Sequence, residues 1–179
     1  KIQRALDQYP HWQSDSPLCD KPVIAEQLTG GRSNISLRVS SGEQQFVLRL
    51  DGINPQRLGL NRNAELRIQQ AASLAGLAPQ PIYFNPELGV LVSRYCPEQE
   101  PDWQPREELQ AIAELLRQIH QLPPVKYRLQ ALDRARLYIA MRPEVEAHGE
   151  QKLRIDQELQ SLAQALQDSA EPCLCHNDL

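Results

Sequence analysis

An imidazole, an amide and a carboxylate occupy three consecutive positions near the end of the chain. The run is His176-Asn177-Asp178, and it follows a short apolar stretch. An aspartate on such a loop can orient a hydroxyl group and take its proton, while a neighbouring histidine can fix the loop by packing and hydrogen bonding. The residue types therefore make Asp178 and His176 candidate catalytic residues. A plain polar turn or a helix cap is the alternative interpretation.

The same region offers sulfur and nitrogen ligands for a metal ion. Cys173, Cys175 and His176 lie close together in the sequence. A tetrahedral structural zinc site needs four ligands, and no second cluster of cysteines and histidines supplies the fourth. Zinc binding by these three residues is therefore kept only as a rival hypothesis, which elemental analysis of the purified protein would test.

A second candidate site is the segment Gly30-Gly31-Arg32-Ser33-Asn34, which lies between two predicted strands. Backbone N–H groups in a glycine-containing turn can approach phosphate oxygens closely, because glycine has no side chain and tolerates positive φ. The spacing matches neither the P-loop pattern nor the dinucleotide-binding pattern. An ordinary hairpin turn is therefore the alternative interpretation.

Arg49 lies in a predicted apolar strand, beside Leu48 and Leu50. Burying an unpaired charge is costly, so an arginine at this position needs an acidic partner. Glu65 in the next predicted helix is the candidate, and such a pair could hold a cation against phosphate groups. Because side chains alternate along a strand, we expect Arg49 on the face that Val47 shares. The alternative is an edge-strand arginine that reaches out to water.

The elements that must position these residues follow from hydrophobic periodicity and turn residues. Strands are predicted over 22–28, 35–40, 46–50, 81–84 and 90–95. The helix after the third strand should begin near Asn61 and end before Gly76, since asparagine caps helix starts and glycine fits the position after a helix. A short helix is predicted over 2–8, and longer ones over 105–122, 130–141 and 151–167. These elements indicate an α+β fold, sheet-rich over residues 1–95 and helical over residues 96–179.

The composition narrows the class of protein. The chain has 179 residues and a formal net charge of −4, which argues against a general nucleic-acid binder because such proteins usually carry a basic face. No apolar run approaches the ~20 residues of a membrane helix, and no secretion leader is visible. The four cysteines are too few and too unevenly spaced for a disulfide framework. We therefore expect a cytoplasmic protein without nucleic-acid or membrane partners.

Taken in order, these features resemble the choline kinase and aminoglycoside phosphotransferase superfamily, which shares the protein-kinase-like fold. The order is a double-glycine turn, an arginine on the third strand, a helical glutamate, a connector into helices and the run His-Asn-Asp-Leu. The similarity extends from about Leu18 to Leu179, and residues 175–179 are its most specific part. The resemblance implies a small five-stranded antiparallel lobe with one helix, followed by the start of a mainly helical lobe.

The resemblance also implies roles for single residues. Asp178 matches the catalytic aspartate, and Arg49 stands where many related kinases carry a lysine paired with a helical glutamate. The stretch 92–97 resembles the hinge that reads adenine through backbone groups. The nucleotide-binding residues implied in this way are Gly30, Gly31, Arg32, Ser33, Asn34, Arg49, Glu65, Arg94 and Cys96.

The implied activity is transfer of the γ-phosphate of ATP to a hydroxyl group of a small cationic metabolite. Choline, ethanolamine or thiamine is the expected acceptor, because many aminoglycoside enzymes have His-Gly-Asp where this chain has His-Asn-Asp; an aminoglycoside is the alternative. The magnesium ligands of the family are expected beyond Leu179, so we expect a C-terminally incomplete chain that is inactive alone. A non-catalytic nucleotide-binding or scaffold protein of this fold is the rival from another class.

Overall fold

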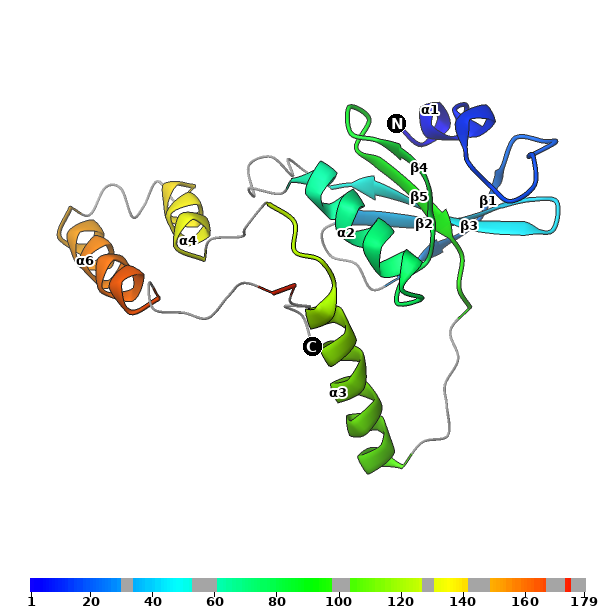
Figure 1. Ribbon diagram of the computed structural model, residues 1–179. Helices are drawn as coiled ribbons and strands as arrows, with labels where there is room; N and C mark the ends of the chain where they lie inside the picture. Colours follow the sequence, from blue (N-terminus) through cyan, green and yellow to red (C-terminus); the bar gives the residue numbers. More distant parts are fainter. Residues whose placement is uncertain are drawn as a thin grey trace. The chain divides into compact units, whose positions relative to one another are not determined.

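The computed structural model describes residues 1–29, 34–52, 61–97, 104–126, 131–141, 149–166 and 173–174. It divides into two compact units. The first unit contains the N-terminal segment, a five-stranded sheet and two longer helices, α2 and α3 (Figure 1). The second unit contains α4 and α6.

Five antiparallel strands form one sheet in the order β1-β2-β3-β5-β4 (Figure 1). The strand bounds are β1 Val23–Leu28, β2 Asn34–Ser41, β3 Gln44–Asp51, β4 Pro81–Asn85 and β5 Val90–Arg94. The tight turn between β2 and β3 contains Gly42 with φ +57°, a conformation that glycine adopts without steric cost. The third strand is central, between β2 and β5.

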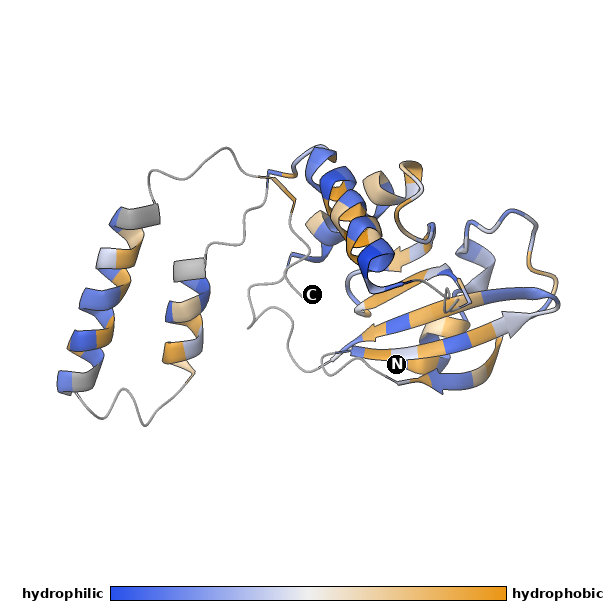
Figure 2. Ribbon diagram, turned by 90° about the horizontal axis from the view of Figure 1, so that it is seen from below, coloured by the Kyte–Doolittle hydropathy of each residue, from blue (hydrophilic) through white to orange (hydrophobic). Residues whose placement is uncertain are grey.

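One face of the sheet is apolar and is covered by the N-terminal segment. This segment contains α1 (Ile2–Leu6) and the 3-10 helix η1 (Tyr9–His11). Apolar and polar residues alternate along β2 and β3, as the colours of Figure 2 show, and the burial of these residues alternates with them, so one set of residues faces the core. Trp12 meets the ring of Phe46 edge to face, with centroids 5.6 Å apart. The buried core consists of Ala5, Leu6, Trp12, Leu37, Val39, Phe46, Leu48, Leu50, Ile82, Val90 and Val92.

Helix α2 (Arg62–Leu74) connects β3 to β4 in the sequence and ends as predicted. The N–H of Gly76 donates to the carbonyl of Ser73 at 3.0 Å, and the N–H of Leu77 donates to the carbonyl of Ala72 at 2.8 Å. Gly76 has φ +76°, so these two bonds form a Schellman motif. The motif fixes the end of α2 and therefore the direction in which the chain leaves toward β4.

Helix α3 (Pro105–Gln121) begins with a capping box. The N–H of Gln104 donates to Oε2 of Glu107 at 3.2 Å, and Pro105 occupies a position where its missing N–H costs nothing. No residue of α3 is buried, and Leu109 and Leu115 are exposed. The predicted domain boundary near residue 95 stays a prediction, because the unit that holds the sheet also holds α3.

The second unit is a pair of helices. Its members are α4 (Ala131–Ala140) and α6 (Gly149–Leu166), which contact each other and correspond to the helices predicted over 130–141 and 151–167. Leu159 of α6 is buried, whereas Leu153 and Leu162 are exposed. None of the helices in the described parts of the chain has the length and apolar character that a membrane crossing requires.

Candidate functional site

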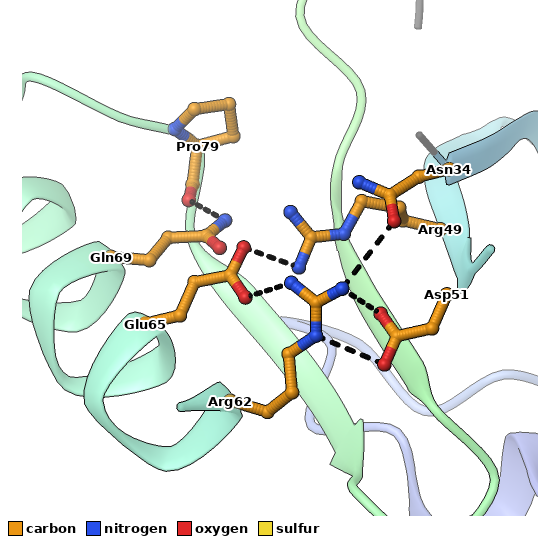
Figure 3. A network of polar contacts seen from close by, with 7 residues as sticks. All are labelled: Asn34, Arg49, Asp51, Arg62, Glu65, Gln69 and Pro79. Atoms are coloured by element: carbon orange, nitrogen blue, oxygen red, sulfur yellow. Dashed lines mark hydrogen bonds and ion pairs between the residues drawn. The ribbon is translucent and has the colours of Figure 1, made fainter. Parts of the chain in front are cut away.

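Arg49 and Glu65 form an ion pair on the face of the sheet that points away from the apolar core. The Nη2 atom of Arg49 lies 2.6 Å from Oε1 of Glu65 (Figure 3). Their side chains are 24% and 34% exposed, so the pair is partly shielded from water. The pairing that the sequence predicts is therefore confirmed, and Arg49 lies opposite the core residues Leu48 and Leu50 as expected.

A second arginine, which the sequence analysis missed, binds the same glutamate. Nη1 of Arg62 lies 2.6 Å from Oε2 of Glu65. Nη2 of Arg62 lies 2.7 Å from Oδ1 of Asp51, and Nε donates to Oδ2 of Asp51 at 2.9 Å. Arg62 and Asp51 are 13% and 8% exposed, so both are more deeply buried than Arg49. We call these four residues, Arg49, Asp51, Arg62 and Glu65, the charge cluster.

Local periodicity brings the four side chains together. Arg49 and Asp51 are two positions apart on β3, so they share a face of the sheet. Arg62 and Glu65 are three positions apart on α2, so they are neighbours on the helix surface. Both spacings are visible in the sequence, and they are the signal that could have identified Asp51 and Arg62. The contact between strand and helix is tertiary, and no local pattern reveals it.

Asp51 is held by the backbone of the β4–β5 turn. Its N–H donates to the carbonyl of Gly89 at 2.8 Å. Gly89 has φ +64°, and a Cβ atom built on it would lie 3.0 Å from both Cβ and Oδ2 of Asp51. Only glycine fits this approach without displacing the aspartate. The turn therefore sets the position of the carboxylate that binds Arg62.

The charges in the cluster balance, with two guanidinium groups facing two carboxylates. Burial lowers the pKa of the Arg62 guanidinium, but the hydrogen bond and charge of Glu65, followed by those of Asp51, outweigh it and raise this pKa above its ordinary value. Within the described residues, the buried Nε of Arg49 has no hydrogen-bond partner. An unpaired buried donor costs about 1–3 kcal/mol. Arg49 is therefore the member of the cluster with a donor still to satisfy.

The predicted phosphate loop is described only at its last residue. Asn34 begins β2, and its Oδ1 accepts a hydrogen bond of 3.5 Å from Nη2 of Arg62. The structure thus brings Asn34 to the charge cluster (Figure 3). The predicted residues Gly30, Gly31, Arg32 and Ser33 lie outside the described residues, and their contact with phosphate stays a prediction.

The two predicted hinge residues lie away from the charge cluster. Arg94 pairs with Phe46 across the β3–β5 ladder, so its side chain lies on the apolar face, where it forms an ion pair with Asp15 of the N-terminal segment. The N–H of Arg94 donates to the carbonyl of Gln80 at 3.0 Å. Cys96 is exposed just after β5. Their predicted role was contact with adenine through the backbone, and that role stays a prediction.

A pocket of about 560 Å³ lies at the end of the sheet where β5 leaves it. Arg94 and Tyr95 line this pocket together with Arg38 of β2. The guanidinium of Arg38 lies over the ring of Tyr95, 5.3 Å from its centroid, and Nε of Arg38 is 2.8 Å from Oε1 of Glu26. No member of the charge cluster lines it. The pocket therefore lies at the predicted hinge and is separate from the charge cluster.

The predicted catalytic residues cannot be placed in the site. Asp178 and His176 lie outside the described residues, as does Cys175, so both the catalytic and the zinc hypotheses stay predictions. Cys173 is described and exposed. Within the described segments, no group of three histidine, cysteine, aspartate or glutamate residues could hold a metal ion.

Several solved structures share this fold. Choline kinase LicA from Streptococcus pneumoniae is 20% identical with a TM-score of 0.62, over 87% of this chain and 57% of that one. Ethanolamine kinase from Plasmodium vivax is 16% identical with a TM-score of 0.61, over 92% of this chain and 52% of that one. Spectinomycin phosphotransferase in complex with ADP and spectinomycin is 14% identical with a TM-score of 0.50, over 99% and 62%. The predicted α+β, protein-kinase-like fold is confirmed.

This chain spans only 52% to 62% of the length of those three structures. A search of the curated proteins found no match. A model of the family described as "Phosphotransferase enzyme family" matches residues 24–179, which is most of the chain. The predicted resemblance to the choline kinase and aminoglycoside phosphotransferase superfamily is confirmed by this match and by the shared fold. The chain belongs to the phosphotransferase enzyme family.

Proposed function

We propose that the intact protein, meaning this chain with any residues that precede or follow it, transfers the γ-phosphate of ATP to a hydroxyl group of a small cationic metabolite. The observation that carries the proposal is the half-buried pair of Arg49 and Glu65 on the face of the sheet that points away from the apolar core. A cation held in this way suits the binding of phosphate oxygens, because charge-assisted hydrogen bonds to phosphate are strong and directional.

In this proposal Arg49 is the member of the charge cluster that binds the polyphosphate of ATP. Glu65 binds Arg49 at one terminal nitrogen, Nη2, and the Arg49 side chain is still 24% exposed. Arg49 thus keeps donor capacity for an anion. In the proposal, backbone N–H groups of the predicted loop at residues 30–34 also bind the phosphates. The backbone of Arg94 and Cys96 binds adenine.

The chemical step falls to Asp178 in this proposal. Its carboxylate accepts the proton of the acceptor hydroxyl while the hydroxyl oxygen forms a bond to the γ-phosphorus and the bond from that phosphorus to ADP breaks. His176 holds the loop that carries Asp178. Arg49 orients the phosphates and offsets the negative charge that develops on them.

Magnesium is expected in this family, but the described residues do not fit a magnesium site. They contain no group of three acidic or other ligating side chains, and both carboxylates of the charge cluster are bound to arginines. The resemblance assigns the magnesium ligands to positions beyond Leu179. We therefore assign no residue of this chain to the metal.

The acceptor is proposed from the sequence. Choline, ethanolamine and thiamine are the first candidates because of the run His176-Asn177-Asp178, and an aminoglycoside is the alternative. Two of the structures with this fold are those of a choline kinase and an ethanolamine kinase, and a third is that of a spectinomycin phosphotransferase. Free thiols at Cys19 and Cys96 suit the cytoplasmic location that we propose.

The test is a phosphate-transfer assay of the intact protein with ATP and a panel of choline, ethanolamine, thiamine and aminoglycosides. We expect one acceptor to be phosphorylated, and we expect Asp178→Asn to lower kcat at least about a hundredfold while ATP binding stays nearly unchanged. ATP binding without transfer to any acceptor would favour the scaffold hypothesis. Normal turnover of Asp178→Asn would remove that residue from the mechanism.

A further inference from the structure

Arg62 occupies a place where an arginine is not expected from helix physics alone. It is the first residue of α2, where the unsatisfied N–H groups give the helix end a partial positive charge. A cation in the first turn is therefore unfavourable by itself. Contacts with Asp51 and Glu65 must compensate, and both lie within 2.7 Å.

Through these contacts Arg62 connects β3 to α2. Arg62 binds both carboxylate oxygens of Asp51 through Nη2 and Nε, an arrangement that fixes a planar guanidinium in one orientation. Its remaining nitrogen, Nη1, binds Oε2 of Glu65. Glu65 consequently has only Oε1 for Arg49 (Figure 3).

We propose that Arg62 is a positioning residue that keeps the Arg49 guanidinium available to phosphate groups; this inference rests on the proposed function. Arg62 does so by occupying one oxygen of Glu65 and both oxygens of Asp51. Arg49 is then held at one nitrogen by Glu65 and is only partly neutralised.

The consequence of losing Arg62 follows from the charges. Glu65 would be able to turn both oxygens toward Arg49 and bind it in the bidentate manner, which withdraws donors from phosphate. Asp51 would become a carboxylate with 8% exposure and no guanidinium of its own, two positions from Arg49 on the same face. Its negative charge would attract Arg49 and repel phosphate oxygens. Both effects lower the affinity for phosphates and leave the adenine contacts unchanged.

The experiment compares the affinities of ATP and of adenosine for the intact protein by calorimetry. The ratio of the two dissociation constants isolates what the phosphates contribute. We expect Arg62→Gln to weaken ATP binding at least about tenfold and to change adenosine binding less than about twofold. Arg62→Lys should bind ATP more tightly than Arg62→Gln but less tightly than the unaltered protein, because a lysine cannot reproduce the bidentate contact with Asp51. The matched control is Arg67→Gln, an exposed arginine on the same helix, which should leave both constants unchanged.

A variant that fails to fold does not end the test. Asp51→Asn combined with Arg62→Gln removes the buried carboxylate together with its partner, so it avoids the unpaired charge. It still frees the second oxygen of Glu65, and we expect the same selective loss of ATP affinity.

The outcomes separate this inference from the proposed function. If the unaltered protein binds no ATP, the proposed function fails and the inference fails with it. If the unaltered protein binds ATP, and the Arg62 variants lose ATP and adenosine affinity equally or lose neither, the inference alone is overturned. Equal losses would identify Arg62 as a residue that only supports the fold.

Discussion

The two faces of β3 are held in place by different forces. On one face Phe46, Leu48 and Leu50 are buried among the side chains of the N-terminal segment and β5. On the other face Arg49 and Asp51 bind partners on α2 through ion pairs of 2.6–2.9 Å. Apolar contact is roughly proportional to area and has no direction, whereas each ion pair depends on where single atoms lie.

The two faces of β3 therefore serve different purposes: the apolar face contributes to stability, and the charged face contributes to activity. Leu48 is fully buried, so an apolar side chain of similar volume could replace it at modest cost. Arg49 has no such equivalent, because its guanidinium must meet Glu65 at one nitrogen and keep another for an anion. Substitutions on the apolar face should therefore change the free energy of unfolding, and substitutions on the charged face should change activity.

The largest effect on stability is expected for Leu48→Ala. Leu48 is fully buried at the centre of the sheet, so the substitution should cost about 2–5 kcal/mol of unfolding free energy. Urea unfolding followed by circular dichroism measures it. Val47→Ala, on the opposite face of the same strand and only partly buried, is the control and should cost clearly less. Equal costs would show that the two faces do not differ in the way described.

The next effect concerns the pair of Arg49 and Glu65. Arg49→Ala and Glu65→Ala should each lower kcat/KM of the intact protein at least about tenfold, and the double variant should be little worse than the poorer single variant. Arg49→Lys should keep partial activity. Melting temperatures should change less than for Leu48→Ala. Losses that multiply in the double variant would show that the two residues act separately.

A smaller effect is expected for Gly89→Ala. Two costs add here: the strain of an alanine at φ +64° and a contact of 3.0 Å with Asp51. The strain alone amounts to about 1–2 kcal/mol. Gly42→Ala shares the strain, since φ is +57°, but its Cβ would meet nothing within 4 Å. We expect both variants to lose stability and only Gly89→Ala to lose activity as well, by a few-fold. Equal activity of the two would mean that Asp51 tolerates displacement.

The smallest effect is expected where an ion pair lies in water. The hydrogen bond from Lys21 lowers the pKa of the exposed Asp7. A lowered carboxyl pKa adds stability above about pH 4, and this contribution is lost as the pH falls through the folded-state pKa. Between pH 7 and pH 3 the melting temperature should therefore fall slightly less in Asp7→Asn than in the unaltered protein. Asp20→Asn should behave like the unaltered protein. A large change at Asp7 would contradict the view that exposed pairs contribute little.

Much of the fold could be predicted because the relevant signals are local. Alternation over residues 35–40 predicted β2, and apolar runs between turn residues predicted the other strands. Pro105 and Gly76 marked a helix start and a helix end that the structure confirms. The pairing of Arg49 with Glu65 could be predicted because a buried arginine in an apolar strand needs an acidic partner. The prediction did not extend to Arg62, because no local pattern in the sequence shows that its side chain meets Asp51.

The features that the sequence did not predict have a physical origin too. Asp51 and Arg62 meet only because α2 packs beside the end of β3, and the sequence shows no pattern for that contact. The face of Arg94 depends on the β3–β5 register, which pairs it with Phe46; a shift by one residue would turn its side chain over. Gly30, Gly31, Arg32, Ser33, His176 and Asp178 lie outside the described residues, and their roles stay predictions.

The strand order also bears on how the first unit assembles. β1, β2 and β3 form a meander, and β4 pairs with β5, so three of the ladders join strands that are consecutive in the sequence. The β3–β5 ladder alone joins strands separated by α2 and β4. Closing long chain segments costs entropy before the contacts are made, so non-local pairing is slow. We expect the meander and the β4–β5 hairpin to form first and to dock late through this ladder. The N–H of Asp51, at the end of β3, would donate its hydrogen bond to the carbonyl of Gly89 only in that final step.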